Sequence, residues 1–264
     1  MSKHIHIVEP RDTHTHTIIL LHGRGSNATE FASEFFESQA SDDKFLGQIF
    51  PTYKWVFPCA ALRHAQIEGE ELHQWFDMEC VQKPYQDPDK LQTVGLRESL
   101  EFIRNVIERE AREAGGFDKV FLGGISQGCA TAITACLTVQ KPLAGFIAFS
   151  GWFPFARLGS EGFKCMEDLH ALVESLHDVV VDSRKPDTSV GVENIRLELQ
   201  TPVLVEHALD DEVVPHALGR DLRDTLVSFG SEVQLEEYQN GGHWINEPKG
   251  IDDMVDFIKS KAIG

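Results

Sequence analysis

Four short apolar stretches, each followed by loop residues and then by a helical pattern, constrain most strongly what this chain can fold into. The stretches cover residues 17–21, 120–123, 143–149 and 201–205. Each is almost free of polar side chains, which is typical of strands that are buried on both faces. Such strands alternating with helices predict an α/β fold, with a mostly parallel central sheet and helices on both of its faces.

Local signals mark where helices begin and end between these strands. Asn27 and Glu30 have the spacing of a capping box and predict a helix that runs to about residue 38. A long amphipathic pattern begins near residues 87–88 and stops at the glycine pair 115–116. Further helices and strands are predicted at residues 54–58, 127–139, 214–229, 232–238 and 250–263.

The length of 264 residues is that of one large α/β domain, so we expect residues 1–264 to form a single unit. Residues 153–200 interrupt the alternation of strands and helices, because a connection between strands normally needs far fewer residues. This insertion precedes the strand at 201–205. It contains a helical pattern at 164–181 and a polar segment at 182–189. It is either a surface excursion or a cap over a pocket.

Composition excludes several classes of function. Asp and Glu number 42 against 24 Lys and Arg, a formal charge of −18 that repels nucleic acid and anionic lipid surfaces. The start of the chain has no apolar secretion signal, and no apolar run is long enough to span a bilayer, so we expect a cytoplasmic protein without membrane insertion. The five scattered cysteines predict free thiols, and the histidine spacings predict no metal site.

The pentapeptide Gly124-Ile125-Ser126-Gln127-Gly128 follows the strand at 120–123 and has the pattern G-x-S-x-G. In one interpretation Ser126 only caps the next helix, since serine is favoured there. In the other it is a nucleophile held on a sharp turn between strand and helix. Spacing alone does not decide between them, so the choice depends on whether an acid and a base follow in order.

Both appear after later strands. The loop after residues 203–205 contains Asp210 and Asp211, and the paired glycines before His243 follow the strand that ends near residue 238. Ligands of such sheets lie at the carboxyl ends of the strands, so these side chains are expected at one edge. A carboxylate, an imidazole and a serine in this order suit nucleophilic catalysis, with Ser126 attacking, His243 moving the proton and Asp211 orienting the imidazole.

A developing oxyanion requires preorganised N–H donors. One is expected from the residue after the nucleophile, Gln127, and one from the loop after the first apolar strand, where Arg24 is the candidate. With an acid, a base and two oxyanion donors in this order, the sequence favours the nucleophile, and Ser126 would also cap the helix that follows.

These residues together resemble the phospholipase/carboxylesterase branch of the α/β-hydrolases, which includes the acyl-protein thioesterases. The resemblance covers most of the chain, through residues 20–26, 74–77, 124–128, 150–152, 207–215 and 242–243. It implies an α/β-hydrolase fold and cleavage of carboxylic esters or thioesters through an acyl-enzyme, without a cofactor. The family's H-G-x-x-D-x-x-V-P pattern places the acid at Asp211 rather than Asp210, and Trp75 would line the substrate pocket.

Departures from the family concern the substrate. Arg24 stands where thioesterases commonly have leucine, residues 67–73 are acidic where a relative would be apolar, and Trp244 replaces a common serine and would wall off part of the pocket. We expect a small-molecule ester or an acylated protein as substrate and no nucleic-acid partner. Lysophospholipase or short-acyl esterase activity is an alternative, and so is a ligand-binding receptor without catalysis. Acyl length, ester or thioester preference and oligomeric state stay open.

Overall fold

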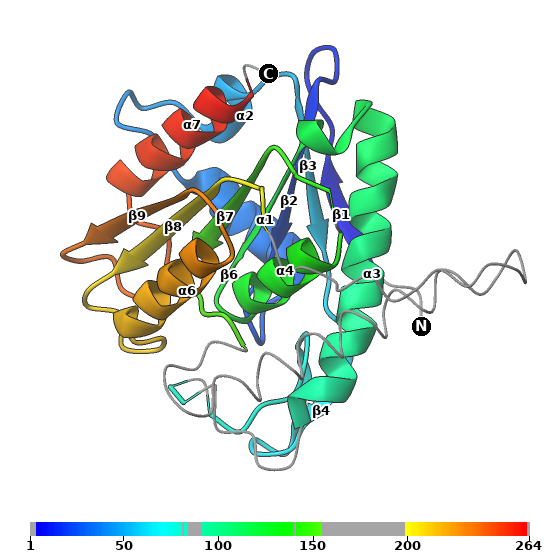
Figure 1. Ribbon diagram of the computed structural model, residues 1–264, viewed down its shortest axis with the longest axis vertical. Helices are drawn as coiled ribbons and strands as arrows, with labels where there is room; N and C mark the ends of the chain where they lie inside the picture. Colours follow the sequence, from blue (N-terminus) through cyan, green and yellow to red (C-terminus); the bar gives the residue numbers. More distant parts are fainter. Residues whose placement is uncertain (1–3, 81, 84–90, 140, 155–198, 263–264) are drawn as a thin grey trace, which may run out of the picture.

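The computed structural model describes residues 4–80, 82–83, 91–139, 141–154 and 199–262 (Figure 1). A seven-stranded sheet in the order β1-β3-β2-β6-β7-β8-β9 forms its centre. All neighbours are parallel except β1, which pairs antiparallel with β3 at the edge. The strands of this sheet are β1 (Ile5–Val8), β2 (His16–Leu21), β3 (Tyr53–Pro58), β6 (Val120–Ile125), β7 (Gly145–Phe149), β8 (Val203–Ala208) and β9 (Val233–Tyr238).

Helices cover both faces of the sheet, and Figure 1 shows α4 and α6 in front of it with α1 behind. The helices are α1 (Ala28–Glu37), α2 (Leu46–Ile49), α3 (Leu91–Ala114), the 3-10 turn η1 (Phe117–Lys119), α4 (Gln127–Thr138), α6 (His216–Ser228) and α7 (Lys249–Lys261). Asn27 accepts hydrogen bonds from the N–H groups of Thr29 and Glu30, which confirms the predicted start of α1.

The core has two halves because side chains alternate along each strand. Ile19 and Leu21 of β2 pack into the half covered by α3, α4 and α6. Ile18 and Leu20 pack into the other half, which α1 and α7 cover. All four side chains are completely buried, so the apolar run at 17–21 belongs to a strand with no exposed face, as its sequence predicts.

A two-stranded antiparallel hairpin lies outside the central sheet. It consists of β4 (Leu62–Ala65) and β5 (Glu70–His73), and its sequence is too polar and too short to have predicted it. The insertion predicted at residues 153–200 falls almost wholly on residues 155–198, outside the described residues, so its role as an excursion or a cap stays a prediction.

The described cysteines carry free thiols, in agreement with the sequence, and burial raises the pKa of Cys136 to about 12. Among the described helices, none carries an apolar stretch that could cross a membrane. No group of three or more potential metal-ligating side chains comes together in the described ranges.

Candidate active site

Ser126 lies on a sharp turn between β6 and α4. Its φ of 57° and ψ of −125° are unusual for a residue with a side chain, and its N–H donates to the Phe149 carbonyl at 3.0 Å. We expected the same residue to cap α4. It does occupy the N-cap position, but its side chain makes no capping hydrogen bond. The strained backbone therefore presents a hydroxyl that α4 does not use.

The glycines around Ser126 let the turn pass under the loop after β2. A Cβ on Gly124 would lie 2.8 Å from the Leu21 carbonyl oxygen, and one on Gly128 would overlap the carbonyl oxygens of Leu21 and His22. No larger residue fits at either position without moving the backbone. The small residues of the G-x-S-x-G pattern are thus explained by close backbone contact.

Asp211 and His243 are joined by a hydrogen bond. His243 Nδ1 donates to Asp211 Oδ2 at 2.8 Å, and Asp211 Oδ1 accepts the N–H groups of Val213 and Val214, each at 2.9 Å. Burial alone would raise the pKa of Asp211, but hydrogen bonds from His207, His243 and the Val214 N–H hold it well below its usual range. The carboxylate is therefore ionised and fixed in orientation.

The neighbouring Asp210 has a different task. It is exposed, and its Oδ1 accepts the N–H of Gly242 at 2.9 Å. Gly241 and Gly242 have φ angles of 144° and 62°, a region that favours glycine, and they bring His243 back over the sheet edge. Asp210 thus holds the loop that carries the histidine, while Asp211 holds the histidine itself.

His207 is a member of this site that the sequence reasoning did not single out. Its Nε2 donates to the Val214 carbonyl at 2.9 Å and lies 3.2 Å from Asp211 Oδ2, and the side chain is completely buried. Its position four residues before Asp211 in the family pattern was the signal that could have found it. Asp211 is consequently held by two imidazoles rather than one.

Strand order brings the nucleophile and the acid–base pair to the same edge. Ser126 follows β6, Asp211 follows β8 and His243 follows β9, and these strands lie in the order β6-β7-β8-β9. Within the described residues, Ser126 makes no hydrogen bond to His243. The structure thus pairs Asp211 with His243 and places Ser126 at the same edge without closing the last contact.

The loop after β2 approaches the nucleophile closely. A Cβ on Gly23 would lie 3.6 Å from Ser126 Cβ. His22 fixes this loop, because its Nδ1 donates to the Gly23 carbonyl at 2.7 Å and its Nε2 accepts the Ala60 N–H at 3.0 Å. Burial lowers the pKa of His22 to about 4, so the imidazole is neutral, as both bonds require.

The N–H groups of Arg24 and Gln127 donate to no other group in the described part of the chain. Gln127 begins α4 directly after Ser126, and Arg24 follows Gly23. The two predicted oxyanion donors are therefore unused backbone N–H groups on the two segments that meet at Ser126.

The side chain of Arg24 binds the hairpin. Its two terminal nitrogens donate to Glu68 at 2.6 and 2.7 Å, and its Nε donates to Gln74 Oε1 at 2.9 Å. A further bond joins the Gly25 N–H to the His73 carbonyl at 2.9 Å. The two departures noted in the sequence, an arginine and an acidic segment, thus compensate each other as a bidentate ion pair.

The side chain of Gln127 binds the backbone of residues 75 and 76, which follow the hairpin. Its Oε1 accepts the Trp75 N–H at 2.9 Å and its Nε2 donates to the Phe76 carbonyl at 2.8 Å. The Trp75 indole N–H donates to the His22 carbonyl at 2.9 Å, and none of the Trp75 side chain is exposed. Trp75 supports the loop after β2, and its predicted place in a substrate pocket stays a prediction.

Trp244 is half-buried and packs against Phe31 of α1, with ring centroids 6.0 Å apart in a T-shaped arrangement. The indole ring thus anchors the residue after His243 to the core half under α1. Whether it also closes one side of a substrate pocket stays a prediction.

A mostly parallel sheet of this order, with a strained serine after one strand and an Asp–His pair after two others, defines the class of α/β-hydrolases. Comparison with known proteins is more specific. A family model described as phospholipase/carboxylesterase matches residues 2–185, and the chain therefore belongs to this family. Its members hydrolyse ester bonds, and the chain is a hydrolase of this kind.

Individual relatives cover nearly the whole chain. Acyl-protein thioesterase 1 of Gibberella zeae is 25% identical over 253 residues, covering 94% of this chain and 91% of its own length. Carboxylesterase SOBER1 of Arabidopsis thaliana is 23% identical over 248 residues, with coverage of 94% and 91%. The crystal structure of Zea mays acyl-protein thioesterase 2 matches with a TM-score of 0.69 at 23% identity, covering 98% of this chain and 99% of that one, which confirms the fold.

Proposed function

We propose that the protein is a serine hydrolase that cleaves carboxylic esters or thioesters through a covalent acyl-enzyme. Ser126 is the nucleophile, His243 the general base and acid, and Asp211 the carboxylate that orients the imidazole. The N–H groups of Arg24 and Gln127 form the oxyanion hole. The observation that carries the proposal is the 2.8 Å bond from His243 Nδ1 to a buried Asp211, at the sheet edge where Ser126 sits on its strained turn.

The steps follow from these atoms. His243 Nδ1 donates to Asp211, so its Nε2 is free to take the Ser126 proton while Oγ attacks the acyl carbon. The tetrahedral oxyanion accepts the N–H groups of Arg24 and Gln127, and removing one such donor typically costs about 3–4 kcal/mol of barrier. The imidazolium then protonates the leaving alcohol or thiol. Water, deprotonated by the same imidazole, attacks the acyl-serine and releases the carboxylic acid.

The ion pair beside the oxyanion hole bears on the substrate. Arg24, whose N–H is one predicted oxyanion donor, carries a guanidinium that is paired with Glu68. The two side chains are only 14% and 34% exposed. A charged wall at this position favours short or polar acyl groups over a long alkyl chain. We therefore propose short-acyl esters or thioesters as the preferred substrates. Relatives named acyl-protein thioesterase and carboxylesterase are compatible with either leaving group.

Covalent labelling tests the nucleophile without requiring the natural substrate. A fluorophosphonate should add one phosphonyl group to the wild-type protein, and peptide mass spectrometry should place it on Ser126. Ser126→Ala should abolish both the label and a burst of p-nitrophenol from an activated ester. Ser41→Ala is a matched control, because this serine is exposed and its N–H donates to Asp252 of α7 rather than to a residue of the site. A label on another residue, or turnover that survives in Ser126→Ala, would exclude the assignment.

A chain-length series tests the substrate. Oxygen esters and thioesters with the same acyl groups, from acetyl to palmitoyl, are compared by kcat/KM. We expect the maximum at short chains, and the ratio of the two series at equal length gives the leaving-group preference. A maximum at long chains would contradict the short-acyl proposal but not the mechanism.

A further inference from the structure

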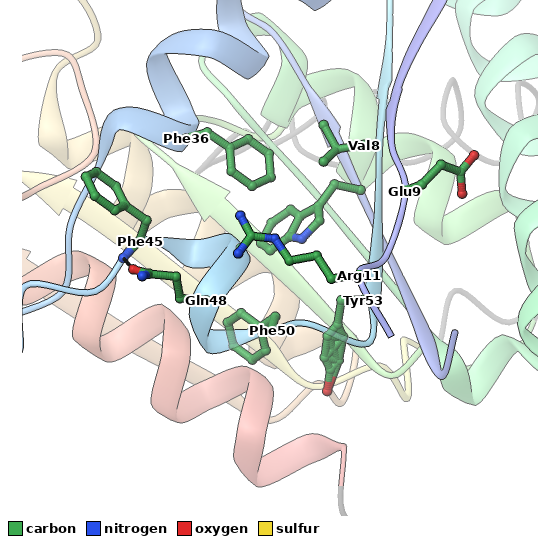
Figure 2. A pocket seen from close by; sticks show the side chains of 10 residues that line it. Val8, Glu9, Arg11, Phe36, Phe45, Gln48, Phe50 and Tyr53 are labelled. Atoms are coloured by element: carbon green, nitrogen blue, oxygen red, sulfur yellow. Dashed lines mark hydrogen bonds between the residues drawn. The ribbon is translucent and has the colours of Figure 1, made fainter. Parts of the chain in front are cut away.

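A second concave site lies away from the candidate active site. It is a cavity of about 390 Å³ with mainly aromatic walls, within the range of small-molecule sites. Phe36 of α1, Phe45 and Phe50 on either side of α2, and Trp55 of β3 contribute rings, and Arg11 and Gln48 contribute polar groups (Figure 2). We call this cavity the aromatic pocket.

Sheet register separates the aromatic pocket from the nucleophile. Tyr53 and Trp55, which line it, pair with His16 and Ile18 at the amino end of β2. Ser126 lies after the carboxyl end of β6, which is parallel to β2. The two sites therefore lie at opposite ends of the parallel strands, and the aromatic pocket is no part of the proposed catalytic machinery.

Arg11 is an uncompensated cation at this pocket. Its guanidinium makes no ion pair or hydrogen bond within the described residues, although the chain carries 42 acidic side chains. Figure 2 shows the guanidinium directed between Phe36 and Phe50 on the side of Gln48, whereas the carboxylate of Glu9 points away. Arg11 is exposed, and a planar guanidinium beside aromatic side chains without a carboxylate partner is suited to bind a carboxylate from a ligand.

Two further donors at the aromatic pocket lack partners. The indole N–H of Trp55 is buried and has no hydrogen-bond partner, an arrangement that is uncommon in folded proteins. The Gln48 side chain uses only its oxygen, which accepts the Phe45 N–H at 2.9 Å, so its amide hydrogens are free. Phe45 is 41% exposed, so the rim is open to an incoming ring. The Gln48 amide is thus a free donor on the same wall as the Arg11 guanidinium, which fits a carboxylate head group, whereas the buried Trp55 N–H is not accessible to a ligand.

We propose that the aromatic pocket binds a monocarboxylate carried on a single aromatic ring. The guanidinium of Arg11 takes the carboxylate in a bidentate pair, with the Gln48 amide as an additional donor, and the ring packs among Phe36, Phe45 and Phe50. An aromatic body suits these walls because ring pairs gain contact in offset or edge-to-face arrangements. The site depends neither on Ser126 nor on hydrolysis.

Titration of the ¹⁵N-labelled protein tests the proposal, with phenylacetate as the probe and the neutral phenylacetamide as its isostere. The Trp55 indole N–H signal should move with a saturable dependence and a Kd of about 1 mM or tighter. The amide should bind at least about tenfold more weakly, since a charge-assisted pair is lost. Absence of saturation, or equal binding of the amide, would overturn the proposal.

Matched variants locate the binding. Arg11→Met should weaken phenylacetate at least about tenfold, whereas Lys44→Met, which removes an exposed cation beside Phe45, should change it less than about twofold. Phe45→Ala gives a second variant that leaves Arg11 in place and should weaken binding several-fold. Two outcomes would show that the aromatic pocket is not the site. One is phenylacetate binding that persists in Arg11→Met, for example at the sheet edge near His243. The other is an equal loss of affinity in Lys44→Met.

Discussion

At the scale of single residues, the two adjacent aspartates make different contacts around His243. Asp211 is buried and binds His243, while Asp210 is exposed and binds the loop glycine before it. A carboxylate is essential only where a charge must stabilise an imidazolium, whereas an amide oxygen accepts a backbone N–H as well. The family pattern assigns the acid to Asp211 rather than Asp210, and it contains no information on what Asp210 contacts.

Asparagine substitutions should therefore have unequal effects. Asp211→Asn should lower kcat by about 10⁴, because the wrong imidazole tautomer is favoured. Asp210→Asn keeps an acceptor for the Gly242 N–H and should lower kcat less than about tenfold. Steady-state kinetics with an activated ester, alongside thermal unfolding of both variants, gives the comparison. The opposite order would move the catalytic acid to residue 210.

Glu206 is a buried acid that the proposed mechanism does not use. It is 3% exposed, and neither carboxyl oxygen has a hydrogen-bond partner within the described residues. Burial, followed by repulsion from Asp253 and Glu236, raises the pKa of this carboxyl well above its usual value. An acid with a raised folded-state pKa lowers stability above its unfolded pKa, because the unfolded chain then releases a proton that the folded chain retains.

Glu206→Gln should accordingly stabilise the fold in a pH-dependent way. At about pH 4 the two proteins should have similar free energies of unfolding, because Glu206 is protonated in the folded state and mostly protonated in the unfolded chain. Near pH 7.5 the variant should be more stable by at least about 1 kcal/mol. Urea denaturation at both pH values measures the difference. A difference that does not grow between these pH values would show that the folded carboxyl is ionised.

At the scale of elements, the hairpin β4–β5 and the following residues connect both halves of the predicted oxyanion hole. Arg24 binds Glu68 and Gln74, while Gln127 binds the backbone of Trp75 and Phe76. The segment from Glu68 to Phe76 therefore fixes both residues whose N–H groups form the predicted oxyanion hole. Preorganised donors of this kind act through their fixed positions, so small displacements are costly.

Glu68→Ala should consequently lower kcat by about three- to tenfold with little change in KM, because the Arg24 loop loses one anchor while the substrate contacts remain. Its free energy of unfolding should stay within about 1 kcal/mol of wild type, since the pair is partly exposed. Glu70→Ala on the same hairpin is the matched control. An equal loss of kcat in both variants would show that the ion pair has no specific role.

The elements that sequence predicted best are those with uninterrupted apolar patterns. The strands at β2, β6, β7 and β8 and the ends of α1 and α3 were placed within a few residues. The hairpin and the short helix α2 were not predicted, because four-residue elements with mixed polarity have too little periodicity. The three proposed catalytic residues followed from order and spacing. His207 and the contacts of Arg24 and Gln127 did not, because they depend on side chains that only the fold brings together.

At the scale of the whole molecule, a buried charge cluster joins the sheet to α3. Lys54 of β3 is 6% exposed and donates to Glu110 and Glu113 at 2.7 Å each, and Glu110 is completely buried. Burial would lower the pKa of Lys54, but the two carboxylates raise it, so the ammonium stays charged. The packing of the longest described helix thus depends on a balanced set of charges.

Replacing Lys54 tests how much the stability of the fold depends on this charge cluster. Lys54→Met removes one of the two cations that bind the buried Glu110, leaving Arg109 on its other oxygen, and should lower the free energy of unfolding by about 1.5–3 kcal/mol. Lys44→Met, at an exposed pair with Asp42, should change it by less than about 1 kcal/mol. Equilibrium denaturation of both variants distinguishes them, and a small loss for Lys54→Met would show that Arg109 or water replaces the lysine.

The order of the strands along the chain also determines when the candidate site is complete during synthesis. Residue 126 is made well before residues 211 and 243, and the strands that carry the latter two form one side of the sheet. Under the mechanism proposed above, a chain synthesised only as far as α4 contains Ser126 without Asp211 and His243. Esterase activity then requires β8 and β9 to have joined the sheet, so it follows the synthesis of these C-terminal strands.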